Sequence, residues 1–162
     1  MTDTLPEELS NALFEEDELG VVLRSHLYIE NKLEELLSLM VPFPRYYEEM
    51  NLSYASKVKL ACAMGLDPQF KPMLLALGTI RNKFSHNLDK SIDEKMVKDL
   101  HSASHKILRE SLPKFVNKHS TDGKVITSFN EAHPRDQFTT LVVGLWIVLC
   151  GAVNEVEDEK FV

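Results

Sequence analysis

The longest apolar stretch of the sequence limits the folds open to this chain more than any other feature. It covers residues 138–153 and reads FTTLVVGLWIVLCGAV, sixteen residues with two threonines and two glycines. A helix that spans a membrane needs about 20 apolar residues, so the stretch is more typical of a buried or interface helix. A helix that is apolar nearly all round must be covered on most sides. We therefore expect the other elements to surround a helix over residues 137–156.

Two earlier segments are also predicted to be helices. Residues 17–40 carry apolar side chains at the spacing that places them on one helix face. Ser53 is a typical N-cap residue and Gly65 a typical C-terminal glycine for a helix over residues 54–64. Residues 45–51 are expected to bridge these two helices.

Two further helices are predicted in the middle of the chain. A third helix is expected over residues 67–87, because its opening Asp-Pro pair is typical of a helix N-terminus. A fourth is expected over residues 91–119, where Ser91 and Glu94 have the spacing of a capping box. Pro113 is expected to kink this helix or end its first part.

The composition is typical of a single soluble domain with a substantial core. The chain has 162 residues, of which 44% are hydrophobic and 27% are charged. We divide it into an acidic N-terminal arm (1–15), a helical domain (16–157) and a charged tail (158–162). The expected architecture is an all-α, single-domain bundle of about five helices. Cys62 and Cys150 lie far apart in apolar segments, which predicts two buried, reduced thiols.

The charge and the N-terminus limit the partners and the location. The net charge is −7, and such an acidic protein is not expected to hold DNA on a broad basic face. A small basic pocket that grips one or two phosphates remains open. The N-terminus is acidic and has no apolar signal-peptide stretch. These features predict a cytoplasmic protein that neither enters a membrane nor binds DNA directly.

The segment RNKFSH, residues 81–86, combines residue types that can act on a phosphodiester. Arg81 can hold a phosphate through paired hydrogen bonds, and His86 can move a proton near neutral pH. At helical spacing Arg81 pairs with Ser85 and Asn82 with His86, all beside an apolar stripe. Alternatively, Arg81 and His86 are solvated cations at a helix C-terminus, where the helix dipole favours positive charge.

A second polar pair interrupts the apolar stripe of residues 17–40. His26 and Glu30 lie four residues apart near its middle, and ionisable groups at core-facing positions are costly unless they are paired. Two interpretations remain open. Glu30 holds the guanidinium of Arg81, or His26 and Glu30 form a half-buried pair at a seam between helices.

Other polar residues give weaker signals. His101 and His105 have a spacing that a metal can use, but no carboxylate or cysteine lies at supporting spacing, so we expect surface histidines. Lys57 and Lys59 are expected on a solvated face. No metal and no other cofactor is predicted.

The motif and its surroundings resemble a known superfamily. RNKFSH fits the R-N-x-x-x-H signature of HEPN domains, and residues 52–89 resemble the family of the mannitol-operon repressor (MtlR-like), a likeness that covers about residues 16–105. HEPN domains are small helical bundles that often dimerise. Their catalytic members are metal-independent endoribonucleases of toxin–antitoxin and anti-phage defence systems. The resemblance implies that Arg81 and His86, from both subunits, form the catalytic pair at a dimer interface, with Asn82 as polar support.

Two functions from different classes follow from the resemblance. The first is an endoribonuclease that acts on RNA as a homodimer, with Ser85, Glu30 and His26 as supporting residues and an antitoxin as a possible partner. The second is a non-catalytic transcriptional regulator that acts through protein partners, since no helix-turn-helix with basic recognition positions is evident.

Overall fold

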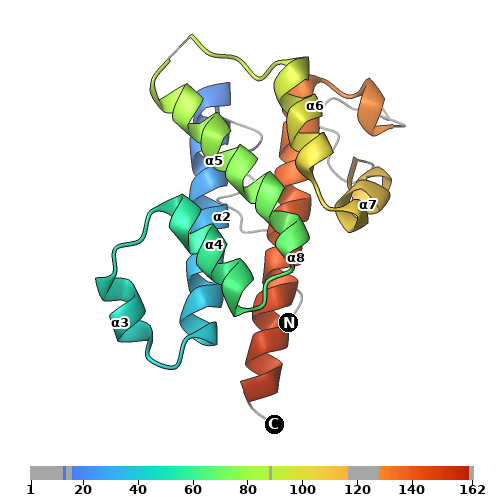
Figure 1. Cartoon of the computed structure of the whole chain (residues 1–162). Coiled ribbons are helices and arrows are strands. Elements are labelled where there is room, and N and C mark those ends of the chain that lie inside the picture. The colour runs from blue at the N-terminus through green and yellow to red at the C-terminus, as the bar shows by residue number, and fades with distance from the viewer. Residues whose placement is uncertain (1–12, 14–15, 88, 117–127, 161–162) are drawn as a thin grey trace.

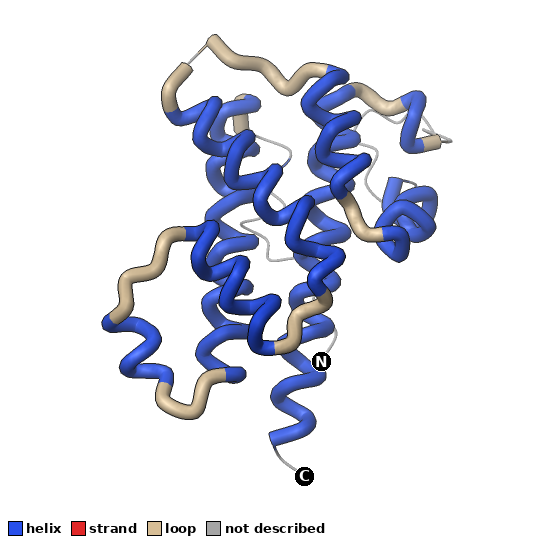
Figure 2. Tube along the Cα trace, in the orientation of Figure 1, coloured by secondary structure: helices blue, strands red, loops and turns tan. Residues whose placement is uncertain are grey.

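The computed structural model describes residues 13, 16–87, 89–116 and 128–160. In this part of the chain every regular element is a helix, and no strand forms (Figures 1 and 2). The predicted all-α class is therefore confirmed, with more helices than the expected five. The α-helices are α2 (Glu18–Met40), α3 (Pro44–Glu49), α4 (Tyr54–Met64), α5 (Lys71–Ser85), α6 (Glu94–Ala103), α7 (Lys106–Val116) and α8 (Pro134–Lys160); the 3₁₀ helices are η1 (Pro68–Phe70) and η2 (Phe129–Glu131).

The ends of the first long helices follow from their capping residues. The Asp17 carboxylate accepts a hydrogen bond of 2.7 Å from the Gly20 amide and so caps α2. Ser53 caps α4, and Gly65 ends it with a φ of 127°, a conformation that favours glycine. The predicted helix over residues 54–64 is confirmed with the same bounds.

The middle of the chain differs from the sequence prediction in three places. The helix expected over residues 67–87 begins with the 3₁₀ helix η1 and continues as α5, which ends at Ser85. Residues 45–51 were expected as a bridge, but Pro44 opens the short helix α3 there, because proline fits the first turn of a helix. The helix expected over residues 91–119 is two helices, and its break lies at Ser104, not at Pro113, which is inside α7.

Local hydrogen bonds explain the break and the start of α6. Ser104 has extended backbone angles, and its hydroxyl donates to the carbonyl of His101 at 2.6 Å, which satisfies the end of α6. The Nδ1 atom of His105 then accepts the Ile107 amide at 3.0 Å and caps the start of α7. The α6 helix itself is capped by Asp93 and not by Ser91, the residue that the capping-box spacing indicated.

The helices pack in two layers. α2 and α8 lie side by side along most of their length, and α4 and α5 cover α2 from the front in Figure 1. α6 packs on α5 and α8, and α7 packs on α8. α8 thus packs on α2, α6 and α7, whereas α3, α4 and α5 pack mainly against α2, so the other helices do not all surround α8 as the apolar stretch led us to expect.

α8 supplies much of the core. Leu141, Leu145 and Leu149 are fully buried, and burial of each such side chain stabilises the fold by about 1.5–3 kcal/mol. By length and composition alone α8 is apolar enough to cross a membrane, and 56% of its most apolar window is buried within the bundle, which is compatible with the core helix of a soluble protein.

The C-terminal tail differs from its prediction. α8 continues to Lys160, so residues 158–160 of the predicted tail are helical. Most of the predicted acidic arm, residues 1–15, lies outside the described residues; of it, Leu13 is described and is buried in the core. Neither cysteine is in a disulfide, and Cys150 is buried whereas Cys62 is half-buried.

Candidate functional site

The last turns of α5 have one apolar and one polar side. Its core stripe is buried as predicted, and the polar side chains of the RNKFSH motif remain exposed. Arg81 donates from Nη1 to the Asn82 amide oxygen at 3.1 Å, and the Ser85 hydroxyl donates to the Arg81 carbonyl at 2.9 Å. His86 follows the last helical residue as the C-cap. The buried stripe residues are Met73, Leu77, Ile80 and Phe84.

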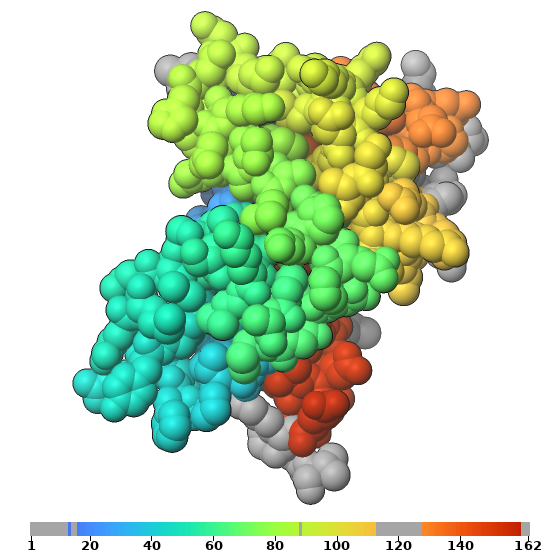
Figure 3. Space-filling model, viewed as in Figure 1, coloured from blue at the N-terminus to red at the C-terminus, as the bar shows by residue number. Residues whose placement is uncertain are grey.

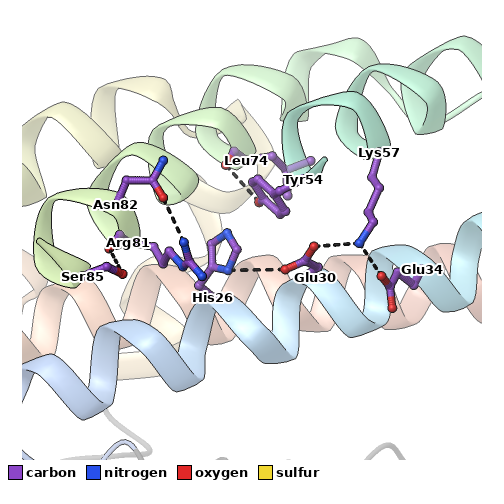
Figure 4. Close-up of polar contacts among 9 residues, drawn as sticks. All are labelled: His26, Glu30, Glu34, Tyr54, Lys57, Leu74, Arg81, Asn82 and Ser85. Atoms are coloured by element: carbon purple, nitrogen blue, oxygen red, sulfur yellow. Dashed lines mark hydrogen bonds and ion pairs between the residues drawn. The ribbon is translucent and has the colours of Figure 1, made fainter. Parts of the chain in front are cut away.

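A cavity of about 600 Å³ lies beside this polar side, between α2, α4 and α5. Figure 4 shows several residues of its lining, with His26 and Glu30 of α2 facing Tyr54 of α4 and Arg81 of α5. The cavity thus joins the two sequence signals, the motif on α5 and the polar pair on α2. Its lining includes His26, Glu30, Ser53, Tyr54, Thr79, Arg81 and Asn82.

The carboxylate of Glu30 is held by α4 and not by the motif. Lys57 Nζ donates to Glu30 Oε1 at 2.7 Å and also bonds Glu34, while Glu30 Oε2 lies 3.8 Å from His26 Nδ1 (Figure 4). Of the two interpretations left open, the geometry matches a His–Glu pair at a helix seam, with no ion pair between Glu30 and Arg81 among the described residues.

Lys57 has a structural role at the seam between α2 and α4. Its side chain is only 13% exposed, so the expected solvated face is wrong for this lysine. Burial disfavours the charged ammonium, but the hydrogen bonds to Glu30 and Glu34 outweigh burial and raise the pKa of Lys57. Two carboxylates from α2 therefore fix the position of α4.

His26 sits deep in the cavity wall. It is 5% exposed, and its ring packs on the Tyr54 ring with the centroids 4.3 Å apart. Burial lowers the pKa of His26; Glu30 opposes this shift, and the positive charges of Arg81 and Lys57 add to it. The imidazole is therefore neutral at neutral pH.

Tyr54 and Gly78 set the shape of the cavity, and the sequence analysis identified neither. The Tyr54 hydroxyl donates to the Leu74 carbonyl at 3.0 Å, and burial raises the pKa of Tyr54 well above its usual value. A Cβ atom at Gly78 would lie 2.9 Å from the Tyr54 ring, so this close approach requires glycine. Ser53, Tyr54 and Lys57 belong to the segment that resembles the mannitol-repressor family. That resemblance was the one feature of the sequence that could have indicated their part in the site.

Arg81 and His86 form no ion pair with a described residue. Among the described residues, the Arg81 side chain bonds only its neighbour Asn82, and no carboxylate lies within ion-pairing distance of either Arg81 or His86. Within one copy of the chain, Arg81 and Asn82 line the cavity, whereas Ser85 and His86 lie outside its lining. A guanidinium, a carboxamide and an imidazole are thus presented to solvent at one helix end.

Comparisons with protein-family models, with curated proteins and with solved structures find no match to this chain. The likeness to HEPN domains therefore stands on the RNKFSH motif and on the helix pattern around it.

His101 and His105 have structural roles. His105 stacks on Phe70 with the ring centroids 4.6 Å apart and faces Asp67, and His101 stacks on Phe129. Both are half-buried, so the expectation of surface histidines is wrong. No group of three or more His, Cys, Asp or Glu residues in the described part of the chain is arranged to hold a metal ion.

Proposed function

We propose that the protein is a metal-independent endoribonuclease of the HEPN type, in which Arg81 binds the scissile phosphate and His86 transfers protons. One observation carries this proposal. Arg81 is an exposed cation without a carboxylate partner among the described residues, although Lys57, on the neighbouring helix, is neutralised by two glutamates. An arginine left unpaired beside a cavity is suited to bind an anion from solution.

The proposed reaction uses the ribose of the substrate as its nucleophile. The 2′-hydroxyl attacks the phosphorus and His86 accepts the 2′-hydroxyl proton. The bond from phosphorus to the 5′-oxygen then breaks as the imidazolium passes that proton to the leaving 5′-oxygen. The products are a 2′,3′-cyclic phosphate and a 5′-hydroxyl. Arg81 stabilises the charge that develops on the phosphate oxygens, and Asn82 orients the guanidinium through its amide oxygen.

A homodimer completes this site. His86 lies outside the cavity lined by Arg81 in one copy, so the His86 of a second copy is proposed to face Arg81 across a shared cleft. Glu30 and His26 act behind the surface as positioning residues, and Ser85 holds the last turn of α5. A cytoplasmic location and control by an antitoxin fit this activity.

The test is cleavage of a fluorescent single-stranded RNA in excess chelator. We expect cleavage by the wild type, with a cyclic phosphate product, and a loss of about 100-fold or more in both Arg81→Ala and His86→Ala. Arg45→Ala and His133→Ala are matched controls, because both side chains are exposed and neither lines the cavity. Absence of cleavage at high protein concentration, or cleavage that both site variants retain, would refute the nuclease.

The second candidate is a non-catalytic regulator that acts through protein partners. The observation that favours it is the apolar surface of the α3 region, where Phe43, Tyr46 and Met50 are 71%, 66% and 59% exposed. Exposed apolar clusters of this kind are typical of contact surfaces. The regulator is supported by two results together. The wild-type protein leaves RNA intact, and it pulls down a DNA-binding partner that Phe43→Ser and Tyr46→Ser no longer retain.

A further inference from the structure

The far end of the bundle contains a second hollow, which the RNKFSH motif does not reach. This α8 groove has a volume of about 670 Å³ and lies where the ends of α2 and α4 and the 3₁₀ helix η1 meet the C-terminal half of α8. Figure 3 shows the red end of α8 emerging below the green surface of this region. Apolar side chains form most of its wall, including Leu36, Met40, Met64, Phe70, Ala152 and Val156.

The groove is open and adaptable. A Cβ atom placed on Gly151 meets nothing within 4 Å, so another backbone can approach α8 closely at this point. Met40 and Met64 contribute flexible thioether side chains, which adjust to differently shaped apolar partners. Grooves with these properties commonly hold the apolar face of an amphipathic helix.

The rim of the groove is acidic. Asp67, Glu155 and Glu159 line it, and an adjoining hollow of about 560 Å³ adds Asp158. Among the residues that the structure describes, no lysine or arginine lines either hollow. Glu155, Asp158 and Glu159 form no ion pair with a described residue, so their charges are not neutralised within the bundle.

We propose that the α8 groove is a docking site for a basic amphipathic helix of a partner protein, whose apolar face is flanked by lysine or arginine. The apolar wall takes the apolar face, and the acidic rim selects for the flanking cations. A second copy of this chain fits poorly at this groove, because two acidic rims that face each other would repel.

The probe for this proposal is a synthetic helical peptide of about four turns, with leucines on one face and lysines beside them. Its control replaces every lysine by glutamate. Fluorescence anisotropy with the full chain is expected to show binding of the lysine peptide, weakened by added salt. The glutamate peptide is expected to bind at least about tenfold more weakly.

Variants of the groove separate specific docking from general attraction to an acidic protein. Gly151→Trp fills the groove and is expected to weaken the lysine peptide about tenfold or more, whereas Lys95→Trp on the exposed side of α6 should not. The double variant Glu155→Gln, Glu159→Gln leaves the groove open and is expected to weaken binding about three- to tenfold. If circular dichroism shows that Gly151→Trp is unfolded, the binding measured with the double variant is the test of the proposal.

Three outcomes would overturn the proposal. The first is equal affinity for the lysine and glutamate peptides, and the second is no binding of the lysine peptide. The third is a dimer in sedimentation equilibrium that Gly151→Trp dissociates, since the groove would then belong to a second copy.

Discussion

The core around α8 and the seam between α2, α4 and α5 are held together in different ways. The α8 core is built from aliphatic side chains such as Leu145 and Leu149, which need no particular partner. The seam contains Glu30 and Lys57, which are stable there only because they bond each other. Apolar contacts stabilise the fold through buried area, while the polar contacts specify how the cavity beside Arg81 is shaped. We therefore expect substitutions in the α8 core to cost more stability than substitutions in the polar seam.

The largest loss of stability is expected in the α8 core. Leu145→Ala removes a fully buried side chain and should lower the free energy of unfolding by about 2–5 kcal/mol, through lost burial and the cavity left behind. Ile147→Ala on the same helix is the matched control, because this side chain is 41% exposed and should cost less than about 1 kcal/mol. Urea unfolding followed by circular dichroism measures both. If the two variants lose equal free energy of unfolding, the buried side of α8 contributes no more to stability than its exposed side.

The polar seam should respond less strongly. Lys57→Met leaves Glu30 and Glu34 without their shared cation, and we expect a loss of about 1–2 kcal/mol, reduced by the partial exposure of both carboxylates. Lys59→Met, at an exposed position of α4, should be nearly neutral. Adding Glu30→Gln to Lys57→Met should recover part of the loss. If it does not, the ion pair is not what joins α4 to α2.

Two glycines sharpen the contrast further. Gly78→Ala introduces a Cβ atom 2.9 Å from the Tyr54 ring, and we expect a net loss of about 1 kcal/mol despite the better helix propensity of alanine. Gly151→Ala gains the same propensity in open space and should stabilise by up to about 1 kcal/mol. Thermal unfolding of the two variants tests this difference in sign, which a purely local helix effect would not produce.

The smallest effect is a dependence on pH. The pKa of His26 is lower in the folded chain than the ordinary 6.5, so the unfolded chain binds more protons just below that pH. The stability that comes from the neutral ring is present above about pH 6.5 and is lost as the pH falls through the folded pKa. Wild type should therefore lose more stability than His26→Gln between pH 7 and about pH 5. Parallel pH profiles would exclude His26 as a contributor.

The sequence predicted the elements that depend on local patterns. The caps Ser53 and Gly65 and the buried stripe of α5 follow from residue type and spacing. The sequence also identified the residues of the motif and the polar pair on α2, although not their arrangement. These predictions succeeded because each depends on neighbours within a few residues.

Contacts between distant segments were not predictable in the same way. Lys57 looked like a surface lysine because the carboxylates that bury it lie 27 and 23 residues away. Gly78 had no signal, since its requirement comes from a ring on another helix. The break at Ser104 depends on His105, whose Nδ1 atom accepts the Ile107 amide. That hydrogen bond requires one orientation of the ring, which the sequence does not reveal.

That cap fixes the tautomer of His105. Because Nδ1 accepts the Ile107 amide, the proton of the neutral ring must be on Nε2, and that atom lies 3.5 Å from the Asp67 carboxylate. One imidazole therefore joins the start of α7 to the turn that precedes α5. The ¹⁵N chemical shifts of this ring would report whether that junction is intact.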